Sequence, residues 1–232
     1  MTTNSERRLR IAIFGATGLA GSGVLRACLA DPEVAEILAI TRRSLDRAGP
    51  KVREIHARNF SDLSSIASEL KGVDACFYCL GIASSGVSET QYRIITKDYA
   101  LEAARVLKST SPASTYHFVS GGSTNINSRF MWARVKGETE EALKAFGLAG
   151  IVCWRPGMIL GERPPQNLSS VARAIYPILR LMRFIPPLSV EAVAIGEAML
   201  QLAYEGQKAG TLENSEIRAA AARYQRRFHQ DG

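Results

Sequence analysis

The fold of this chain is decided by Leu9-Arg10-Ile11-Ala12-Ile13-Phe14-Gly15-Ala16-Thr17-Gly18-Leu19-Ala20-Gly21. The apolar run before the first glycine is typical of a buried strand, and apolar residues at helical spacing continue to Ala30. Glycines let backbone N–H groups approach a pyrophosphate, and the dipole of a helix N-terminus favours its negative charge. The stretch therefore predicts a phosphate-binding strand–turn–helix unit, with an ordinary tight turn as the alternative. The predicted contacts are Gly15, Thr17, Gly18, Leu19, Ala20 and Gly21.

The rest of the chain alternates apolar runs with helical patterns. The predicted strands are Leu9–Phe14, Glu36–Thr41, Val52–Ala57, Ala75–Leu80, Thr115–Ser120 and Gly150–Arg155. The predicted helices are Gly18–Ala30, Leu63–Leu70, Glu89–Lys108 and Phe130–Phe146. Such alternation implies right-handed crossovers, and hence an α/β fold with a doubly wound parallel sheet and helices on both faces.

The alternation stops after Arg155-Pro156-Gly157, where five prolines fall within Gly161–Pro187. A helix over Ser189–Glu205, a short strand over Thr211–Asn214 and a basic helix over Ser215–Phe228 follow. Ligands of doubly wound folds bind beyond the carboxyl ends of the strands. We therefore expect residues 1–232 to form one domain, with 157–190 as a small irregular C-terminal lid on the substrate side. An interfacial amphipathic segment is the alternative for Ile175–Ile185.

Length and composition are those of one globular domain, with 232 residues, 46% hydrophobic and 22% charged. No signal peptide or membrane span is read, so we expect a cytoplasmic location and no stable membrane association. The net charge of +7 is concentrated toward the chain ends, and no zinc-finger spacing or aromatic-basic platform accompanies it. We therefore expect no nucleic-acid partner.

Metal and redox chemistry are not indicated by the cysteines and histidines. Cys76 and Cys79 form a C-x-x-C, but residues three apart on a strand point to opposite faces. The histidines have no spacing shared with cysteines or carboxylates, so neither a metal site nor a Ser-His-Asp triad is predicted.

In combination, Gly15–Gly21, Cys79-Leu80-Gly81, Val135-Lys136-Gly137-Glu138 and Arg155-Pro156-Gly157 resemble the short-chain dehydrogenase/reductase family. The resemblance is to its atypical, epimerase-like branch, and within it to the small Tat-interacting-protein-like members, which bind NADPH. It covers nearly the whole chain and implies a Rossmann fold that holds a nicotinamide cofactor.

The cofactor predicted by this resemblance is NADP(H), with NAD less favoured. Arg42 and Arg43 follow the second strand, where a carboxylate selects NAD, and paired guanidinium groups suit a 2′-phosphate. Asn59, beside Phe60, matches a position that meets the adenine, with Asp62 as the weaker candidate. Four more contacts are expected: Leu80 and Gly81 at the ribose, and Pro156 and Met158 at the carboxamide.

The catalytic set of the family is a Ser, a Tyr and a Lys four residues after the Tyr. Lys136 is present, where it is expected to orient the ribose, but the residue four before it is Trp132. An indole N–H does not give up its proton near neutral pH, so Trp132 cannot be the usual acid. Ser123 is the favoured serine and Ser120 the alternative. Tyr92, Tyr99 and Tyr176 are expected to pack rather than to replace the missing phenol.

Two functions from different classes stay open. The first is an NADP(H)-dependent oxidoreductase that acts on an unknown small carbonyl or sugar-like substrate. The second, favoured by Trp132, is a non-catalytic regulatory or interaction protein that senses NADPH. Related proteins often pair through helices equivalent to Glu89–Lys108 and Phe130–Phe146, so a homodimer is a further expectation.

Overall fold

The computed structural model describes residues 8–45, 49–161, 188–206 and 209–229. Seven strands of these residues form one parallel sheet in the order β3-β2-β1-β4-β5-β6-β9. The strands are β1 (Leu9–Phe14), β2 (Val34–Thr41), β3 (Val52–His56), β4 (Ala75–Tyr78), β5 (Thr115–Val119), β6 (Gly150–Arg155) and β9 (Ala209–Glu213). The order reverses between β1 and β4, and in such folds ligands bind at this point.

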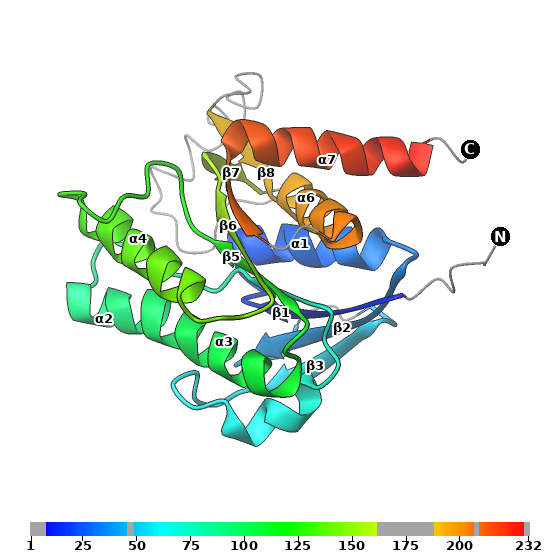
Figure 1. Cartoon of the computed structure of the whole chain (residues 1–232), viewed down its shortest axis with the longest axis horizontal. Coiled ribbons are helices and arrows are strands. Elements are labelled where there is room, and N and C mark those ends of the chain that lie inside the picture. The colour runs from blue at the N-terminus through cyan, green and yellow to red at the C-terminus, as the bar shows by residue number, and fades with distance from the viewer. Residues whose placement is uncertain (1–7, 46–48, 162–187, 207–208, 230–232) are drawn as a thin grey trace.

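Helices cover both faces of the sheet (Figure 1). One face carries α1 (Leu19–Ala30), α6 (Ala192–Glu205) and α7 (Asn214–His229). The other carries a 3₁₀ turn (Ser64–Leu70), α2 (Glu89–Arg93), α3 (Tyr99–Thr110) and α4 (Met131–Lys144). Successive strand residues enter opposite core layers: Ile11 and Ile13 of β1 pack toward α1, whereas Ala12 and Phe14 pack toward α3. The predicted doubly wound α/β fold is confirmed.

Several predicted boundaries differ from the structure. The predicted strand Ala75–Leu80 ends at Tyr78, and the predicted helix Leu63–Leu70 is a 3₁₀ turn. The helix expected over Glu89–Lys108 contains a π-helical turn, Ile94–Asp98, and continues to Thr110. These details depend on local hydrogen-bond register, which hydrophobic periodicity does not specify.

A second, two-stranded parallel sheet pairs β7 (Met158–Leu160) with β8 (Ser189–Glu191). It was not predicted, because two three-residue strands so far apart in sequence leave no periodic signal. Ser189–Glu191 was expected to begin the helix that starts instead at Ala192. Most of the predicted lid, including Ile175–Ile185, lies outside the described residues.

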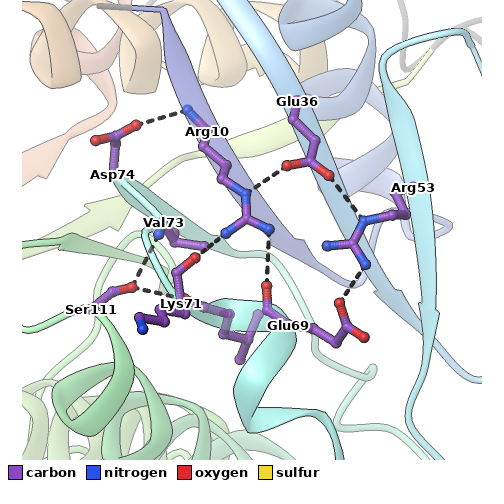
Figure 2. Close-up of polar contacts among 9 residues, drawn as sticks. Arg10, Glu36, Arg53, Glu69, Lys71, Val73, Asp74 and Ser111 are labelled. Carbon is purple, nitrogen blue, oxygen red and sulfur yellow. Dashed lines mark hydrogen bonds and ion pairs between the residues drawn. The ribbon is translucent and has the colours of Figure 1, made fainter.

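A polar network joins the amino ends of the first strands (Figure 2). The Arg10 guanidinium donates to Glu36 at 2.6 Å and to the carbonyl of Glu69 at 3.1 Å, and Arg53 donates to the second oxygen of Glu36 at 2.9 Å. Arg53 also pairs with the Glu69 carboxylate. Arg10 thus fixes three strands and the 3₁₀ turn, and its charge is neutralised within the fold. No helix of the described residues is long and apolar enough to cross a membrane.

Candidate functional site

The glycine turn lies at the carboxyl end of β1, beside the end of β4. Gly15 has φ +79°, and a Cβ there would lie 2.7 Å from both the Cα and the N of Leu80. A Cβ on Gly21 would lie 2.0 Å from the Gly15 carbonyl oxygen. Only glycine fits either position, so these residues bring strand, turn and helix into close contact.

The N-terminus of α1 is open to a ligand. Gly18 is its N-cap and supplies no side chain, and the first intrahelical bond runs from Ser22 N–H to Gly18 O, at 2.9 Å. The N–H groups of Leu19, Ala20 and Gly21 therefore have no acceptor within the helix. The first turn carries no acidic residue, and Thr17 beside it is exposed. This donor set fits a pyrophosphate.

Arg42 and Arg43 are exposed at the end of β2, which pairs with β1. The turn is held by Thr41, whose hydroxyl donates to the Arg43 carbonyl at 2.5 Å and accepts from the Arg43 N–H at 3.2 Å. Within the described residues neither guanidinium forms an ion pair with a carboxylate. Among the described residues, the two cations beside the glycine turn therefore have no carboxylate partner.

The residues expected at the adenine differ in their exposure and in the hydrogen bonds that they already make. The side-chain oxygen of Asn59 accepts from Ser61 N–H at 2.9 Å, which leaves its amide group exposed. Phe60 is buried against Phe14 and Tyr99, with ring centroids 6.2 and 5.8 Å apart, so its side chain belongs to the core. Asp62 accepts from Ser64 N–H, and this bond lowers the pKa of its carboxyl.

Beyond β4, Leu80 packs on the core while its backbone faces Gly15. Gly81 is exposed, and a Cβ there would meet no atom within 4 Å. The space beside Gly81 is therefore open, as a ribose contact requires.

Lys136 and Trp132 converge on the loop after β5. A Cβ on Gly121 would lie 3.5 Å from Lys136 Nζ and 3.6 Å from Trp132 Cζ3. Lys136 Nζ donates to the carbonyl of Ser120, and burial lowers the pKa of this lysine to about 8, against the opposing pull of Glu140. Of the four residues predicted from sequence to share a catalytic site, Lys136, Trp132 and the backbone of Ser120 meet here, whereas Ser123 is exposed.

Neither candidate serine presents a hydroxyl beside Lys136. The Ser120 hydroxyl is buried and lies 3.1 Å from that of Thr124, which donates to the Gly121 carbonyl at 2.7 Å. Ser123 is exposed at φ +64°, in the left-handed region that favours glycine. Sequence reasoning passed over Gly121, because a glycine carries no functional group to mark it.

The backbone of Pro156–Met158 is occupied by the protein itself. The Pro156 carbonyl accepts from Gly122 N–H at 2.8 Å, and the Met158 N–H donates to Leu188 at 2.9 Å. The Gly157 N–H donates to Oδ1 of Asn214 at 2.9 Å. Pro156 has no N–H, so these contacts position the loop and leave no free amide donor from Gly157 or Met158 for a carboxamide.

The other chemistry-bearing residues are structural. Cys76 and Cys79 enter opposite core layers, as predicted, and no metal-binding cluster occurs in the described part of the chain. His117 accepts from the Trp154 indole at 3.2 Å, and burial lowers its pKa to about 3, so it is neutral. Tyr92 is buried, whereas Tyr176 lies outside the described residues.

One hollow, of about 420 Å³, lies away from this site, between α6, α7 and the small sheet. Its lining includes Val193, Glu197, Arg218 and Gln225, and none of the predicted site residues. Two arginines of the basic helix α7 form ion pairs within the fold: Arg223 with Glu205 at 2.9 Å and Arg227 with Glu33 at 2.7 Å.

The parallel sheet, the glycine turn and the open helix end define a nucleotide-binding protein of the Rossmann class. Residues 11–175 match the NAD dependent epimerase/dehydratase family, and the chain belongs to this family. The atypical, epimerase-like resemblance is thereby confirmed, and the family is one that binds a nicotinamide cofactor.

Relatives and solved structures agree with this assignment. The chain is 32% identical to protein fmp52, mitochondrial, of Emericella nidulans over 70% of this chain and 72% of that one. It is 34% identical to FMP52, mitochondrial, of Saccharomyces cerevisiae over 68% of each. UDP-N-acetylglucosamine 4-epimerase from Methanobrevibacter ruminantium superposes with a TM-score of 0.68 at 18% identity, covering 89% of this chain and 76% of that one. WbmF of Bordetella bronchiseptica, solved with NAD⁺, superposes with a TM-score of 0.67 at 14% identity, and the match covers 95% of this chain and 78% of that one.

The names of the relatives overturn one prediction. They describe mitochondrial proteins, so the expected cytoplasmic location is wrong. That expectation rested on the absence of a secretory signal and a membrane span, and neither absence distinguishes the cytoplasm from an organelle.

Proposed function

We propose that the protein is an NADP(H)-dependent oxidoreductase that acts on a small carbonyl or sugar-like substrate. The observation that carries the proposal is the exposed pair Arg42 and Arg43 beside the glycine turn, where an NAD-selecting carboxylate is missing. Guanidinium groups that pair with no carboxylate of the described residues suit a 2′-phosphate, and the first turn of α1 suits the pyrophosphate. When bound, the cofactor supplies or accepts a hydride.

The test compares the affinities for NADPH and NADH in the double variant Arg42→Ala/Arg43→Ala. Removing two charge-assisted contacts is expected to lower the affinity for NADPH by about 100-fold and the affinity for NADH by less than about threefold. Intrinsic fluorescence of the reduced nicotinamide measures both. Arg105→Ala is the matched control, because this exposed arginine on α3 pairs only locally, with Glu102 at 2.7 Å. Equal losses for the two nucleotides would contradict NADP preference.

A second candidate function is a regulatory or interaction protein that senses NADPH without turnover. It is favoured by Trp132, which faces the place beside Lys136 where the family has a phenol, and by the inward-turned hydroxyl of Ser120. Absorbance of the reduced nicotinamide, followed against aldehydes and ketones, separates the two candidates. Turnover that appears only in Trp132→Tyr supports the sensor, and turnover in the parent chain supports the oxidoreductase.

We also propose that the protein pairs with a second copy through the outer sides of α3 and α4, which pack beside each other on one face of the sheet (Figure 1). Mass measurement by light scattering tests this expectation. A monomer at micromolar concentration contradicts it.

A further inference from the structure

The strongest unassigned feature is the space that Gly121 leaves at the end of β5. Among the atoms that surround an added Cβ there, the three nearest are Lys136 Nζ at 3.5 Å, Trp132 Cζ3 at 3.6 Å and Lys136 Cδ at 3.9 Å. The missing side chain thus points between an ammonium and an indole ring. These distances are ordinary van der Waals contacts, so the space takes one methyl-sized group, which would contact those two side chains.

Reduction of a carbonyl requires a proton donor in addition to a hydride. The described side chains around Gly121 offer few proton donors. The Ser120 hydroxyl is committed to Thr124, and Ser123 is on the exposed side of the loop. The indole of Trp132 does not release its proton near neutral pH. Of the two described side chains that lie nearest to the space, Lys136 is the one that carries a proton it can release.

We propose that Lys136 itself donates the proton to the substrate oxygen, in the role that a phenol fills elsewhere. The proposal rests on the oxidoreductase function above. Lys136 Nζ would give its proton to the substrate oxygen as the C=O π electrons move to that oxygen, and a bound reduced nicotinamide would supply the hydride for the new C–H bond. The amine that remains is neutral and regains its proton from water.

The surroundings of Lys136 suit this role. Its bond to the Ser120 carbonyl fixes Nζ beside Gly121, while the ammonium keeps two further hydrogens. Burial brings its pKa down to about 8, and a general acid works best when its pKa lies near the working pH. The charged group that opposes this shift is Glu140, one turn along α4, whose carboxylate is held by Arg155 of β6 at 2.7 Å.

The test uses Lys136→Arg in the full chain, with NADPH and a panel of small aldehydes and ketones. Arginine keeps the charge but does not release a proton. We expect NADPH affinity within about tenfold of the parent and turnover lower by about 100-fold or more. Adding Trp132→Tyr to this variant introduces a phenol and is expected to restore turnover. Lys144→Arg is the matched control, because this lysine lies on the same helix and pairs with Glu141 at 3.0 Å.

A second readout does not depend on turnover. Labelling of the Lys136 amine by acetic anhydride, followed by peptide mass spectrometry, is expected to rise with a midpoint near pH 8. Parent turnover is expected to fall as pH rises through the same range, because only the ammonium donates. Unchanged turnover in Lys136→Arg or a labelling midpoint above 10 overturns the proposal, whereas a parent that binds NADPH but reduces nothing overturns the oxidoreductase function on which it rests. Failure to bind NADPH overturns the proposed function instead.

Discussion

Arg155 holds the carboxylate of Glu140 with two hydrogen bonds, 3.0 Å from Nε to Oε1 and 2.7 Å from Nη2 to Oε2. Glu140 is 1% exposed, so the pair joins the inner side of α4 to the end of β6. Breaking a buried pair by removing one partner leaves an uncompensated charge. The position of Lys136 on the same helix therefore depends on this ion pair.

Replacing Arg155 by Met is expected to lower the free energy of unfolding by about 3 kcal/mol, because Glu140 loses its partner. Urea denaturation measures the change. The matched control is Arg105→Met, which removes the exposed pair with Glu102 and is expected to cost less than about 1 kcal/mol. Similar losses in both variants would show that Glu140 finds another partner.

Gly15→Ala and Gly86→Ala separate backbone strain from steric overlap. Both glycines have φ +79°, so alanine costs about 1–2 kcal/mol at either position. At Gly15 the new Cβ also overlaps the backbone of Leu80 at 2.7 Å, whereas at Gly86 nothing lies within 4 Å. We expect Gly15→Ala to be the more destabilised by chemical denaturation and to lose nucleotide binding. Equal effects would contradict the close contact between turn and β4.

The free energy of unfolding is expected to fall between pH 6.5 and pH 5 because of His117. Burial lowers the pKa of this histidine from 6.5 to about 3, so below pH 6.5 the unfolded chain binds a proton that the folded chain does not. This difference in proton binding lowers the free energy of unfolding by about 2 kcal/mol over this range. Urea denaturation at the two pH values measures it. His117→Gln is expected to remove most of the slope, whereas the exposed His56→Gln is expected to keep it.

Asp31 accepts hydrogen bonds from the hydroxyls of Tyr204 at 2.7 Å and Tyr224 at 2.9 Å, which joins α1 to α6 and α7. Either tyrosine changed to Phe is expected to cost about 1 kcal/mol, because the other still donates to the carboxylate. The double variant leaves that buried oxygen without either hydroxyl. The stability that the double variant loses is expected to exceed the sum of the losses in the two single variants. Thermal denaturation of the three variants measures these losses. Strict additivity would contradict a shared acceptor.

Much of the fold was predictable from sequence, because a parallel sheet buried on both faces leaves long apolar runs. Leu9–Phe14 and Gly150–Arg155 were predicted with the bounds that the structure has. The small sheet of β7 and β8 was not, since its pairing joins residues on either side of 162–187. The cytoplasmic expectation also failed, because location is not a property of the packed core.

The sequence by itself determined the order of strand, glycine turn and helix, because the requirements of this unit are local: a positive φ at Gly15, and an N-cap without a side chain at Gly18. It also predicts that Trp132 stands where the family it resembles has a tyrosine. Only the tertiary structure decided which residues surround Lys136. Contacts between the β5 loop and α4 place Gly121 beside the ammonium and turn the Ser120 hydroxyl into the core, and such contacts depend on packing between distant segments.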